Sequence, residues 1–410
     1  MEDQETRSRY AVDGIVPNAV ALPSSEAEAA AVLREAAQAG MVVVPWGAGT
    51  KQDLGRPLER ADLVLSLEKL DRVVDYVPAD MTITVEAGMR FAELQALTAR
   101  HGQTVSLDPP RAAGATIGGI VSTAASGPRR MAYGGVRDLL LGARVALPDG
   151  RVIKAGGKVV KNVAGYDMPK LLAGSLGTLG VITEVSLKLR PLPADSRTLV
   201  FGLAELGPAM AAAEAILNSE LLPAAMAVLT PEVARRLGAP GPVSLAIALE
   251  ETAENNVYQA DRISQMLAAD AVALVGEAES DFWDRLRNYG DRFGADFRMR
   301  VNTVISDLGQ QLQDCLRSPG PVKYEGVAYV PSGTAMLYGF RNGCKAGAVA
   351  EAVQARMAGG SAVLESGTVE LRRQVDVWGP ARPEWKIVEG IRETFDAGRT
   401  LNRGRFVGRV

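Results

Sequence analysis

Histidine is almost absent from this 410-residue sequence, in which His101 is the only one. Zinc hydrolase sites, Ser-His-Asp triads and histidine-based acid–base schemes usually need at least one well-placed histidine, and often several. His101 follows a helical pattern and precedes Gly102, so we expect it to end a helix. The scarcity of histidine therefore argues against most of the common hydrolytic and zinc-dependent sites.

Cysteine is also scarce, since Cys315 and Cys344 are the only two and neither has a CxxC partner. This chain alone therefore cannot build an iron–sulfur cluster or a zinc site from cysteines, and a reducing compartment is favoured.

Long apolar runs and an excess of one charge are missing as well. No stretch approaches the roughly 18 consecutive apolar residues of a membrane helix, and the charged N-terminal stretch does not look like a secretory signal. The formal net charge of −3 shows no excess of basic residues of the kind that favours binding to nucleic acid. We expect a cytoplasmic protein with no direct membrane insertion, for which partners are the one route left open to membrane association.

Glycine, in contrast, is abundant, with 43 residues that are concentrated between positions 40 and 182. Gly-rich stretches at 47–51, 114–142 and 174–180 suggest a ligand that carries phosphate, because uncovered main-chain N–H groups can converge on an anion. The alternative explanation is that these glycines only serve tight turns between short strands.

Two familiar nucleotide-binding motifs do not fit. A Walker A motif ending at Gly157-Lys158 would need glycine where Val152 stands and a hydroxyl residue where Val159 stands. A Rossmann fingerprint starting at Gly47 would need glycine at Gln52, and the residues that follow do not form a helical pattern.

The pattern along the chain predicts a mixed fold. Residues 24–40 read as a helix, with a capping-box spacing between Ser25 and Glu28, and Pro148-Asp149-Gly150 reads as the turn of a hairpin. Pro191 and Pro193 mark the end of this half. The other expected elements are strands at 41–45, 63–67, 73–77, 82–86 and 181–193 and a helix at 91–100.

Four segments in this order and spacing resemble PCMH-type, or vanillyl-alcohol-oxidase-like, flavoproteins. They span residues 45–51, 115–127, 133–142 and 174–182. The resemblance implies an α+β fold: a PCMH-type FAD-binding domain of two α+β subdomains, plus a second α+β cap domain with an antiparallel sheet. We expect the FAD-binding domain at 1–193, the cap domain at 194–370, and a C-terminal segment at 371–410 that returns to the FAD-binding domain. The residues Leu401-Asn402-x-Gly-Arg also suit this family.

The same resemblance implies one bound FAD. The loops contain no His or Cys for a covalent link, so we expect noncovalent binding and no metal ligand. Lys51 and Arg137 are equally compatible with solvated charges, and Asp138 with a helix cap. The expected FAD-binding residues are Pro45, Trp46, Gly47, Ala48, Gly49, Thr50, Lys51, Pro109, Thr116, Gly118, Gly119, Ser122, Thr123, Ser126, Gly127, Gly180 and Ile182.

Within the family, the chain is most similar to FAD-binding E subunits of bacterial glycolate oxidases. The similarity lies in residues 49–51 with 55–57 and, above all, in the segment 157–171. It implies an FAD-dependent oxidoreductase that acts on the CH–OH group of a small 2-hydroxy acid. It also implies electron transfer to partners, namely a second FAD subunit and an iron–sulfur subunit.

The catalytic residues stay unassigned. Catalytic relatives typically carry an His-x-His pair that holds a metal and a further His as base, and the second half of this chain has no histidine. A free-standing FAD enzyme with a different base and a structural flavin subunit therefore remain as alternatives. Arg341, Arg372 and Arg373 could hold a carboxylate, but the pattern favours a surface charge for each of them. Tyr324, Glu325 and Tyr329 are left equally open.

Overall fold

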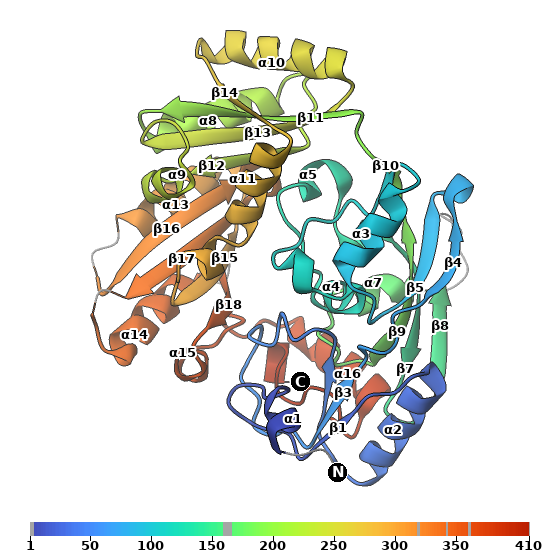
Figure 1. Cartoon of the computed structure of the whole chain (residues 1–410). Helices are drawn as coiled ribbons and strands as arrows, with labels where there is room; N and C mark the ends of the chain where they lie inside the picture. The colour runs from blue at the N-terminus through green and yellow to red at the C-terminus, as the bar shows by residue number, and fades with distance from the viewer. Residues whose placement is uncertain (1–3, 159–165, 318–319, 342, 360–361, 410) are drawn as a thin grey trace. The chain divides into compact units, whose positions relative to one another are not determined.

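The computed structural model describes residues 4–158, 166–317, 320–341, 343–359 and 362–409. By its internal contacts the chain divides into two compact units (Figure 1). Unit 1 comprises residues 1–126, 134–192 and 381–410, and unit 2 comprises residues 127–133 and 193–380. The domain boundaries expected from the sequence remain a prediction.

Unit 1 contains two main sheets. The first is parallel with the strand order β1-β3-β2, and the second is antiparallel with the order β4-β5-β9-β7-β8. A short antiparallel pair joins β10 to β6. The strands are β1 (Ala19–Ala21), β2 (Val43–Trp46), β3 (Leu63–Ser66), β4 (Val73–Val77), β5 (Thr82–Glu86), β6 (Gln103–Thr104), β7 (Leu140–Ala146), β8 (Val152–Gly156), β9 (Val181–Lys188) and β10 (Arg190–Pro191).

Most helices of unit 1 are short. The longer ones, α2, α3 and α16, each place apolar side chains in or against the core shared with the two sheets. The described helices are α1 (Gln4–Ser8), α2 (Glu26–Gln38), α3 (Phe91–Ala99), α4 (Ile117–Thr123), α6 (Val136–Leu139), α7 (Met168–Leu172) and α16 (Trp385–Asp396), with 3-10 turns η1 (Pro78–Asp80), η2 (Ala112–Gly114) and η4 (Val407–Arg409).

The cap of helix α2 shows how local sequence sets these elements. Ser25 is extended, and its hydroxyl accepts the N–H of Glu28 at 3.2 Å, as a helix N-cap requires. The expected capping box is only half formed, because the Glu28 carboxylate accepts the N–H of Ser24 instead, at 2.8 Å. Helix α2 ends at Gln38, before Gly40 with its positive φ of 65°.

Other expected elements of unit 1 are confirmed within a residue or two. The strands at 63–67, 73–77 and 82–86 and the helix at 91–100 are present as β3, β4, β5 and α3. The hairpin is β7–β8, with Gly142 opposite Gly156, and Gly150 takes a φ of 84° in its turn.

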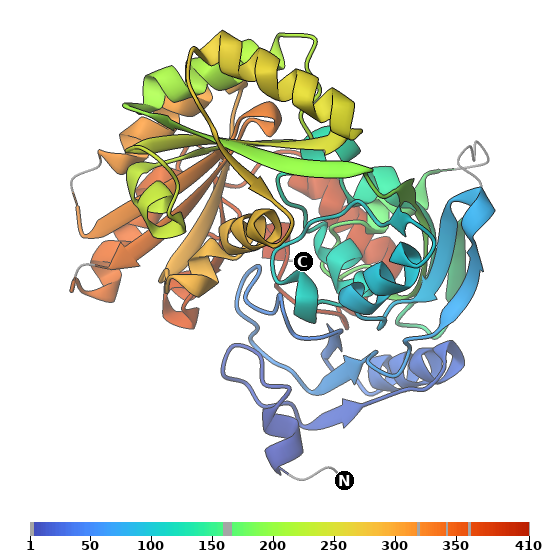
Figure 2. The same cartoon turned by 45° about the horizontal axis from the view of Figure 1, so that its top comes forward.

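Unit 2 is built on one eight-stranded antiparallel sheet with the order β14-β11-β13-β12-β16-β17-β15-β18 (Figures 1 and 2). This arrangement of strands and helices confirms the expected α+β class with an antiparallel second sheet. The strands are β11 (Asp195–Leu203), β12 (Ala225–Leu229), β13 (Val243–Glu251), β14 (Val272–Val275), β15 (Phe297–Asn302), β16 (Val322–Tyr329), β17 (Thr334–Arg341) and β18 (Ala362–Gly367).

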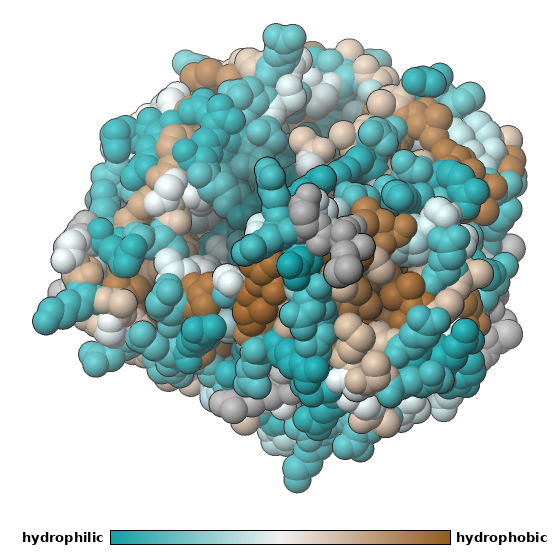
Figure 3. Space-filling model, turned by 60° about the horizontal axis from the view of Figure 1, so that its bottom comes forward, coloured by the Kyte–Doolittle hydropathy of each residue, from teal (hydrophilic) through white to brown (hydrophobic). Residues whose placement is uncertain are grey.

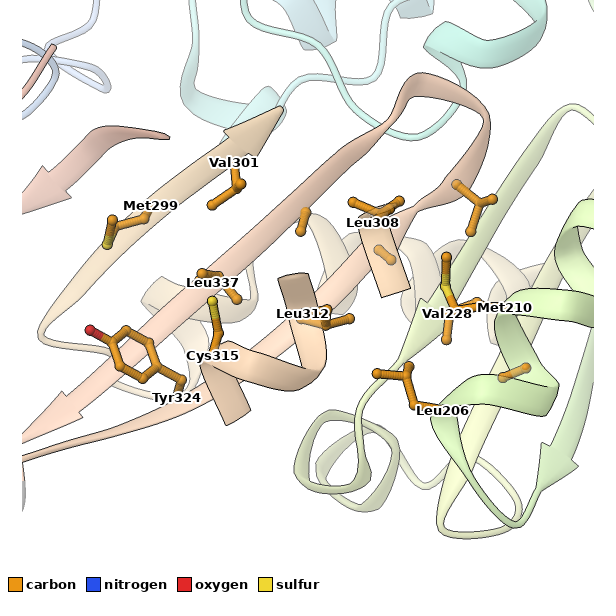
Figure 4. Close-up of a cluster of buried hydrophobic side chains, with 14 of the residues drawn as sticks. Leu206, Met210, Val228, Met299, Val301, Leu308, Leu312, Cys315, Tyr324 and Leu337 are labelled. Carbon is orange, nitrogen blue, oxygen red and sulfur yellow. The ribbon is translucent and has the colours of Figure 1, made fainter. Parts of the chain in front are cut away.

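Helices cover both faces of this sheet. One face packs against α8, α10, α13 and α14 around the large apolar cluster that is drawn in part in Figure 4. The other face packs against α9, α11 and α12 around a smaller cluster. The helices are α5 (Arg130–Tyr133), α8 (Leu206–Leu217), α9 (Pro231–Leu237), α10 (Ala253–Leu267), α11 (Glu277–Arg287), α12 (Tyr289–Arg292), α13 (Ile305–Leu316), α14 (Ala346–Met357) and α15 (Val369–Gln374), with the 3-10 turn η3 (Val330–Ser332).

The surface view in Figure 3 shows separate hydrophobic patches among hydrophilic residues. Among the residues that the structure describes, none of the helices combines the length and the apolar character needed to cross a membrane.

Candidate functional site

The first glycine loop, residues 47–51, leaves strand β2 with a row of exposed donors. The main-chain N–H groups of Gly47, Ala48, Gly49 and Thr50 donate no hydrogen bond to any residue that the structure describes. Gly49 has a positive φ of 71°, and a Cβ at this position would overlap the Trp46 ring. A run of consecutive main-chain N–H groups bent by a left-handed residue is the geometry of an anion-binding concavity.

The second segment differs from the first in this respect. In helix α4 the N–H groups of Ile117, Gly118 and Gly119 all have acceptors, namely the carbonyls of Met89 and Ala87 and the Thr116 hydroxyl. These amides are therefore occupied by the fold. The segment offers a close-packed wall to a ligand, whereas the first loop offers donors.

Two neighbouring glycines of α4 serve different purposes. A Cβ on Gly118 would lie 2.7 Å from the Ala87 Cβ, so this glycine allows α4 to approach the chain just after β5. A Cβ on Gly119 would meet only the Thr116 Oγ1, at 3.2 Å, because this glycine faces the pocket. Gly118 thus allows close packing of α4, whereas Gly119 borders the pocket.

The third loop is held by its neighbours. Leu176 has a positive φ of 53°, and its N–H donates to the Ser122 carbonyl at 2.8 Å. Its own carbonyl accepts the side-chain amide of Asn402 at 2.6 Å. This loop thereby links helix α4 to the C-terminal part of the chain.

The C-terminal segment 400–405 completes the site. The Val43 N–H donates to the Thr400 carbonyl at 2.8 Å, and the Asn402 N–H donates to the Val43 carbonyl at 2.9 Å. Arg405 reaches the first loop, where its guanidinium donates to the Leu54 carbonyl at 3.0 Å and to the Gln52 side chain at 3.1 Å.

These segments enclose one pocket of unit 1. Ten of the residues expected from the sequence line it, together with Gln52, Leu54, Leu176, Asn402 and Arg405, which the sequence analysis did not assign to FAD. Asn402 and Arg405 belong to the C-terminal motif noted above, which was the available signal for them. The lining is Pro45, Gly47, Ala48, Gly49, Thr50, Lys51, Gln52, Leu54, Thr116, Gly119, Ser122, Thr123, Leu176, Asn402 and Arg405.

The remaining expected residues do not line this pocket. Trp46 packs edge-on against Tyr10, with 5.3 Å between ring centroids, and Gly118 packs on Ala87. Gly180 packs against Val145, and Ile182 is a core residue of β9. Pro109 is buried in the loop between β6 and η2, and Ser126 and Gly127 lie in the loop after α4.

The sequence left open whether Lys51 and Arg137 contact the ligand or are solvated charges, and whether Asp138 is a helix cap. Lys51 lines the pocket, whereas Arg137 is exposed. Asp138 caps helix α6, because its carboxylate accepts the Gly135 N–H at 2.8 Å. Residues 159–165 of the segment that most resembles E subunits lie outside the described residues.

Two of the suggested bases, Tyr324 and Glu325, are buried within unit 2. Tyr324 lies beside Cys315 in the apolar cluster of Figure 4, and burial raises its pKa to about 12. Glu325 has no exposed side-chain surface; it accepts the Tyr289 hydroxyl at 2.5 Å and an Arg236 N–H at 3.0 Å. The Glu325 carboxylate is thus bound by protein groups of unit 2.

The suggested carboxylate ligands are scattered. Arg341 forms an ion pair with Asp296 at 2.7 Å, Arg373 is exposed, and buried Arg372 donates to the Gly367 carbonyl at 3.0 Å. Arg298 and Arg300, which the sequence analysis did not consider, both pair with Glu365, at 3.2 and 2.8 Å. Their i, i+2 spacing places them on the same face of β15.

No group of three or more His, Cys, Asp or Glu side chains that could hold a metal ion occurs in the described part of the chain. His101 is exposed after α3 and lies edge-on to Tyr76, with 5.3 Å between ring centroids.

Comparison with known proteins identifies an FAD-binding domain in the N-terminal part of the chain. Residues 17–156 match the family model described as FAD binding domain. Over 304 residues the chain is 27% identical to the glycolate oxidase subunit GlcD of Bacillus subtilis (strain 168), covering 71% of this chain and 64% of that protein. Over 158 residues it is 39% identical to the glycolate oxidase subunit GlcE of Escherichia coli (strain K12), covering 38% of this chain and 45% of that protein.

A further relative is the D-2-hydroxyglutarate dehydrogenase of Xanthomonas citri pv. viticola, 35% identical over 187 residues, which are 46% of this chain and 40% of that protein. The chain therefore matches less than two thirds of the length of these curated relatives. Two solved structures of alkyldihydroxyacetonephosphate synthase share the fold, with TM-scores of 0.68 and 0.70 at 18% and 19% identity. Each match covers 93% of this chain and 75% of the other, and confirms the PCMH-type fold.

Proposed function

We propose that this chain, which carries an FAD-binding domain related to those of glycolate oxidase subunits and D-2-hydroxy-acid dehydrogenases, binds one FAD noncovalently in the pocket of unit 1. The observation that carries the proposal is the row of N–H groups at Gly47–Thr50, which lacks acceptors among the described residues and lines the pocket. A diphosphate supplies the acceptors that such a row needs. The packed wall formed by Gly119, Ser122 and Thr123 would lie against the cofactor.

The reaction we propose is oxidation of the CH–OH group of a small 2-hydroxy acid. FAD, when bound, supplies the acceptor for the hydride of the substrate carbon. The printed functions of the relatives support this substrate class.

We further propose that the chain works as the FAD-binding subunit of a complex, with a second FAD subunit and an iron–sulfur subunit as electron acceptors. The similarity to both GlcD and GlcE supports a multi-subunit arrangement. The sequence offers no second-half histidine as base, and its two cysteines cannot hold a cluster. A free-standing enzyme with another base is the alternative, and a structural flavin subunit is a third possibility.

The first prediction concerns the link to the cofactor. The purified protein should be yellow, and acid or heat precipitation should release its flavin into the supernatant. The reason is the lack of His and Cys from every glycine loop of the site. Flavin fluorescence that stays with the precipitated chain would demonstrate a covalent bond and refute noncovalent binding.

The second prediction tests the subunit role. The isolated chain, mixed anaerobically with glycolate or D-lactate in a stopped-flow instrument, should bleach its FAD slowly or not at all. Adding the partner flavoprotein and the iron–sulfur subunit should restore reduction, because the usual base is missing from this chain. Rapid bleaching in the chain alone would instead establish a free-standing enzyme.

A further inference from the structure

Three main-chain carbonyls in and just after the first loop accept hydrogen bonds from arginine side chains. The carbonyl of Thr50 accepts a hydrogen bond from the Arg111 guanidinium, and the carbonyls of Gln52 and Leu54 accept from the Arg405 guanidinium. These acceptors occupy alternate positions from Thr50, the last residue of the row of N–H groups, to Leu54. The two arginines come from distant parts of the sequence.

Arg111 holds the loop at two points. Besides the Thr50 carbonyl, it contacts both carboxylate oxygens of Asp53, each at 3.2 Å. Arg111 also adopts a left-handed backbone conformation with a φ of 59°, which is costly for a residue with a side chain. In this conformation the Arg111 side chain reaches both Thr50 and Asp53.

Arg405 holds the loop at the pocket wall. Its residue is 2% exposed, and its guanidinium forms an ion pair with Asp13 at 3.7 Å in addition to its bonds with Gln52 and Leu54. The return contact is made by the Arg56 N–H, which donates to the Arg405 carbonyl at 3.0 Å. Hydrogen bonds are thus donated in both directions between the segment 52–56 and Arg405.

A loop that binds an anion through its amides has an electrostatic difficulty. A carbonyl oxygen of a neighbouring peptide that turned toward a bound phosphate would repel it. A planar guanidinium can engage several such oxygens in a fixed geometry, and lysine cannot reproduce this fork. Loop carbonyls that are bound to arginine are therefore kept away from the anion.

From this arrangement we propose that Arg111 and Arg405 are positioning residues, which hold residues 50–54 in the diphosphate-binding shape before the cofactor arrives. The inference rests on the proposed FAD site. Neither arginine is required to touch the phosphates, since each acts through the loop that it shapes. Such preorganisation lowers the entropic cost of binding, and its loss appears as weaker affinity.

The experiment uses the full chain after removal of its flavin. FAD and ADP are titrated separately into wild type, Arg405→Lys and Arg111→Lys by calorimetry, because ADP carries the diphosphate but no flavin ring. Loss of charge-assisted hydrogen bonds should weaken both ligands by about tenfold in each variant. Arg144→Lys is the matched control, because Arg144 makes a similar two-point contact with Glu26 in unit 1 but does not line the pocket.

The outcomes separate the two proposals. Wild type that binds neither FAD nor ADP would refute the cofactor site itself. Wild type that binds both, with Arg405→Lys and Arg111→Lys binding as tightly as Arg144→Lys, would refute the positioning role alone. Urea unfolding of the flavin-free chains provides the structural check. If both variants unfold while Arg144→Lys stays folded, the arginines support the fold and the proposal is overturned.

Discussion

Gly119→Val is expected to weaken FAD binding by roughly 100-fold while the chain keeps its fold, because pressing a branched side chain into occupied volume costs about 1–3 kcal/mol. A Cβ at this position meets only the Thr116 Oγ1, so the added methyl groups enter the pocket. Gly119 does not have a positive φ, so valine there needs no rare backbone conformation, and the Thr116 hydroxyl has to shift by only a few tenths of an ångström. Fluorescence titration of the flavin-free chain with FAD measures the effect.

The control for this prediction is Gly390→Val in helix α16 of unit 1. A Cβ on Gly390 meets no atom within 4 Å, so valine there adds the same side chain to a helix without filling a pocket. We expect FAD affinity within about twofold of wild type for this variant. Full flavin occupancy in Gly119→Val would show that α4 does not border the cofactor.

Glu325→Ala is expected to lower the free energy of unfolding by about 3 kcal/mol, because it removes the fully buried carboxylate that the half-buried Arg236 donates to. Tyr289 loses its acceptor at the same time. Burial and the bond to Glu325 together raise the pKa of Tyr289 well above its usual range, so this hydroxyl stays protonated and remains a donor in need of a partner. Urea denaturation followed by circular dichroism measures the loss.

Glu232→Ala provides the comparison. Glu232 pairs with Arg235 and Lys323 at 2.7 and 2.9 Å, but its side chain is 33% exposed. Removing an exposed pair should cost about 0–1 kcal/mol. Should Glu325→Ala unfold like wild type yet lose 2-hydroxy-acid oxidation in the assembled complex, Glu325 would be the base after all.

The sequence predicted the loops well because their signals are local. Strand β2, the glycines of the first loop and the hairpin around Gly150 each follow from turn chemistry and short apolar runs within a few residues. The pocket lining contains most of the first loop that was expected. Local patterns were enough to place these residues.

The difference between the loops was beyond local patterns. All three looked alike as glycine-rich stretches, but the amides of α4 are taken by the carbonyls of Met89 and Ala87, which come from another part of the chain. Gly180 likewise turned out to face Val145. Whether a glycine serves a ligand or a neighbouring strand depends on tertiary contacts that sequence spacing does not encode.

The buried charges of unit 2 illustrate the same limit. Glu325 and Tyr324 are adjacent on β16, and strand alternation sends them to opposite faces of the sheet. The pattern alone could not tell that Arg236, from helix α9, would meet Glu325 at 3.0 Å. A carboxylate that looked available in the sequence is therefore committed to a partner.

The C-terminal wall of the pocket also determines how late in translation the pocket can be completed. The ribosome makes the loop at 47–51 early, but Asn402 and Arg405 emerge only after all of unit 2 has been translated. Contacts between residues so far apart in the chain form slowly, because closing the long intervening loop costs conformational entropy before the contacts can form. The nascent first half therefore has an incomplete pocket, and its lining is finished only after the synthesis of residue 405.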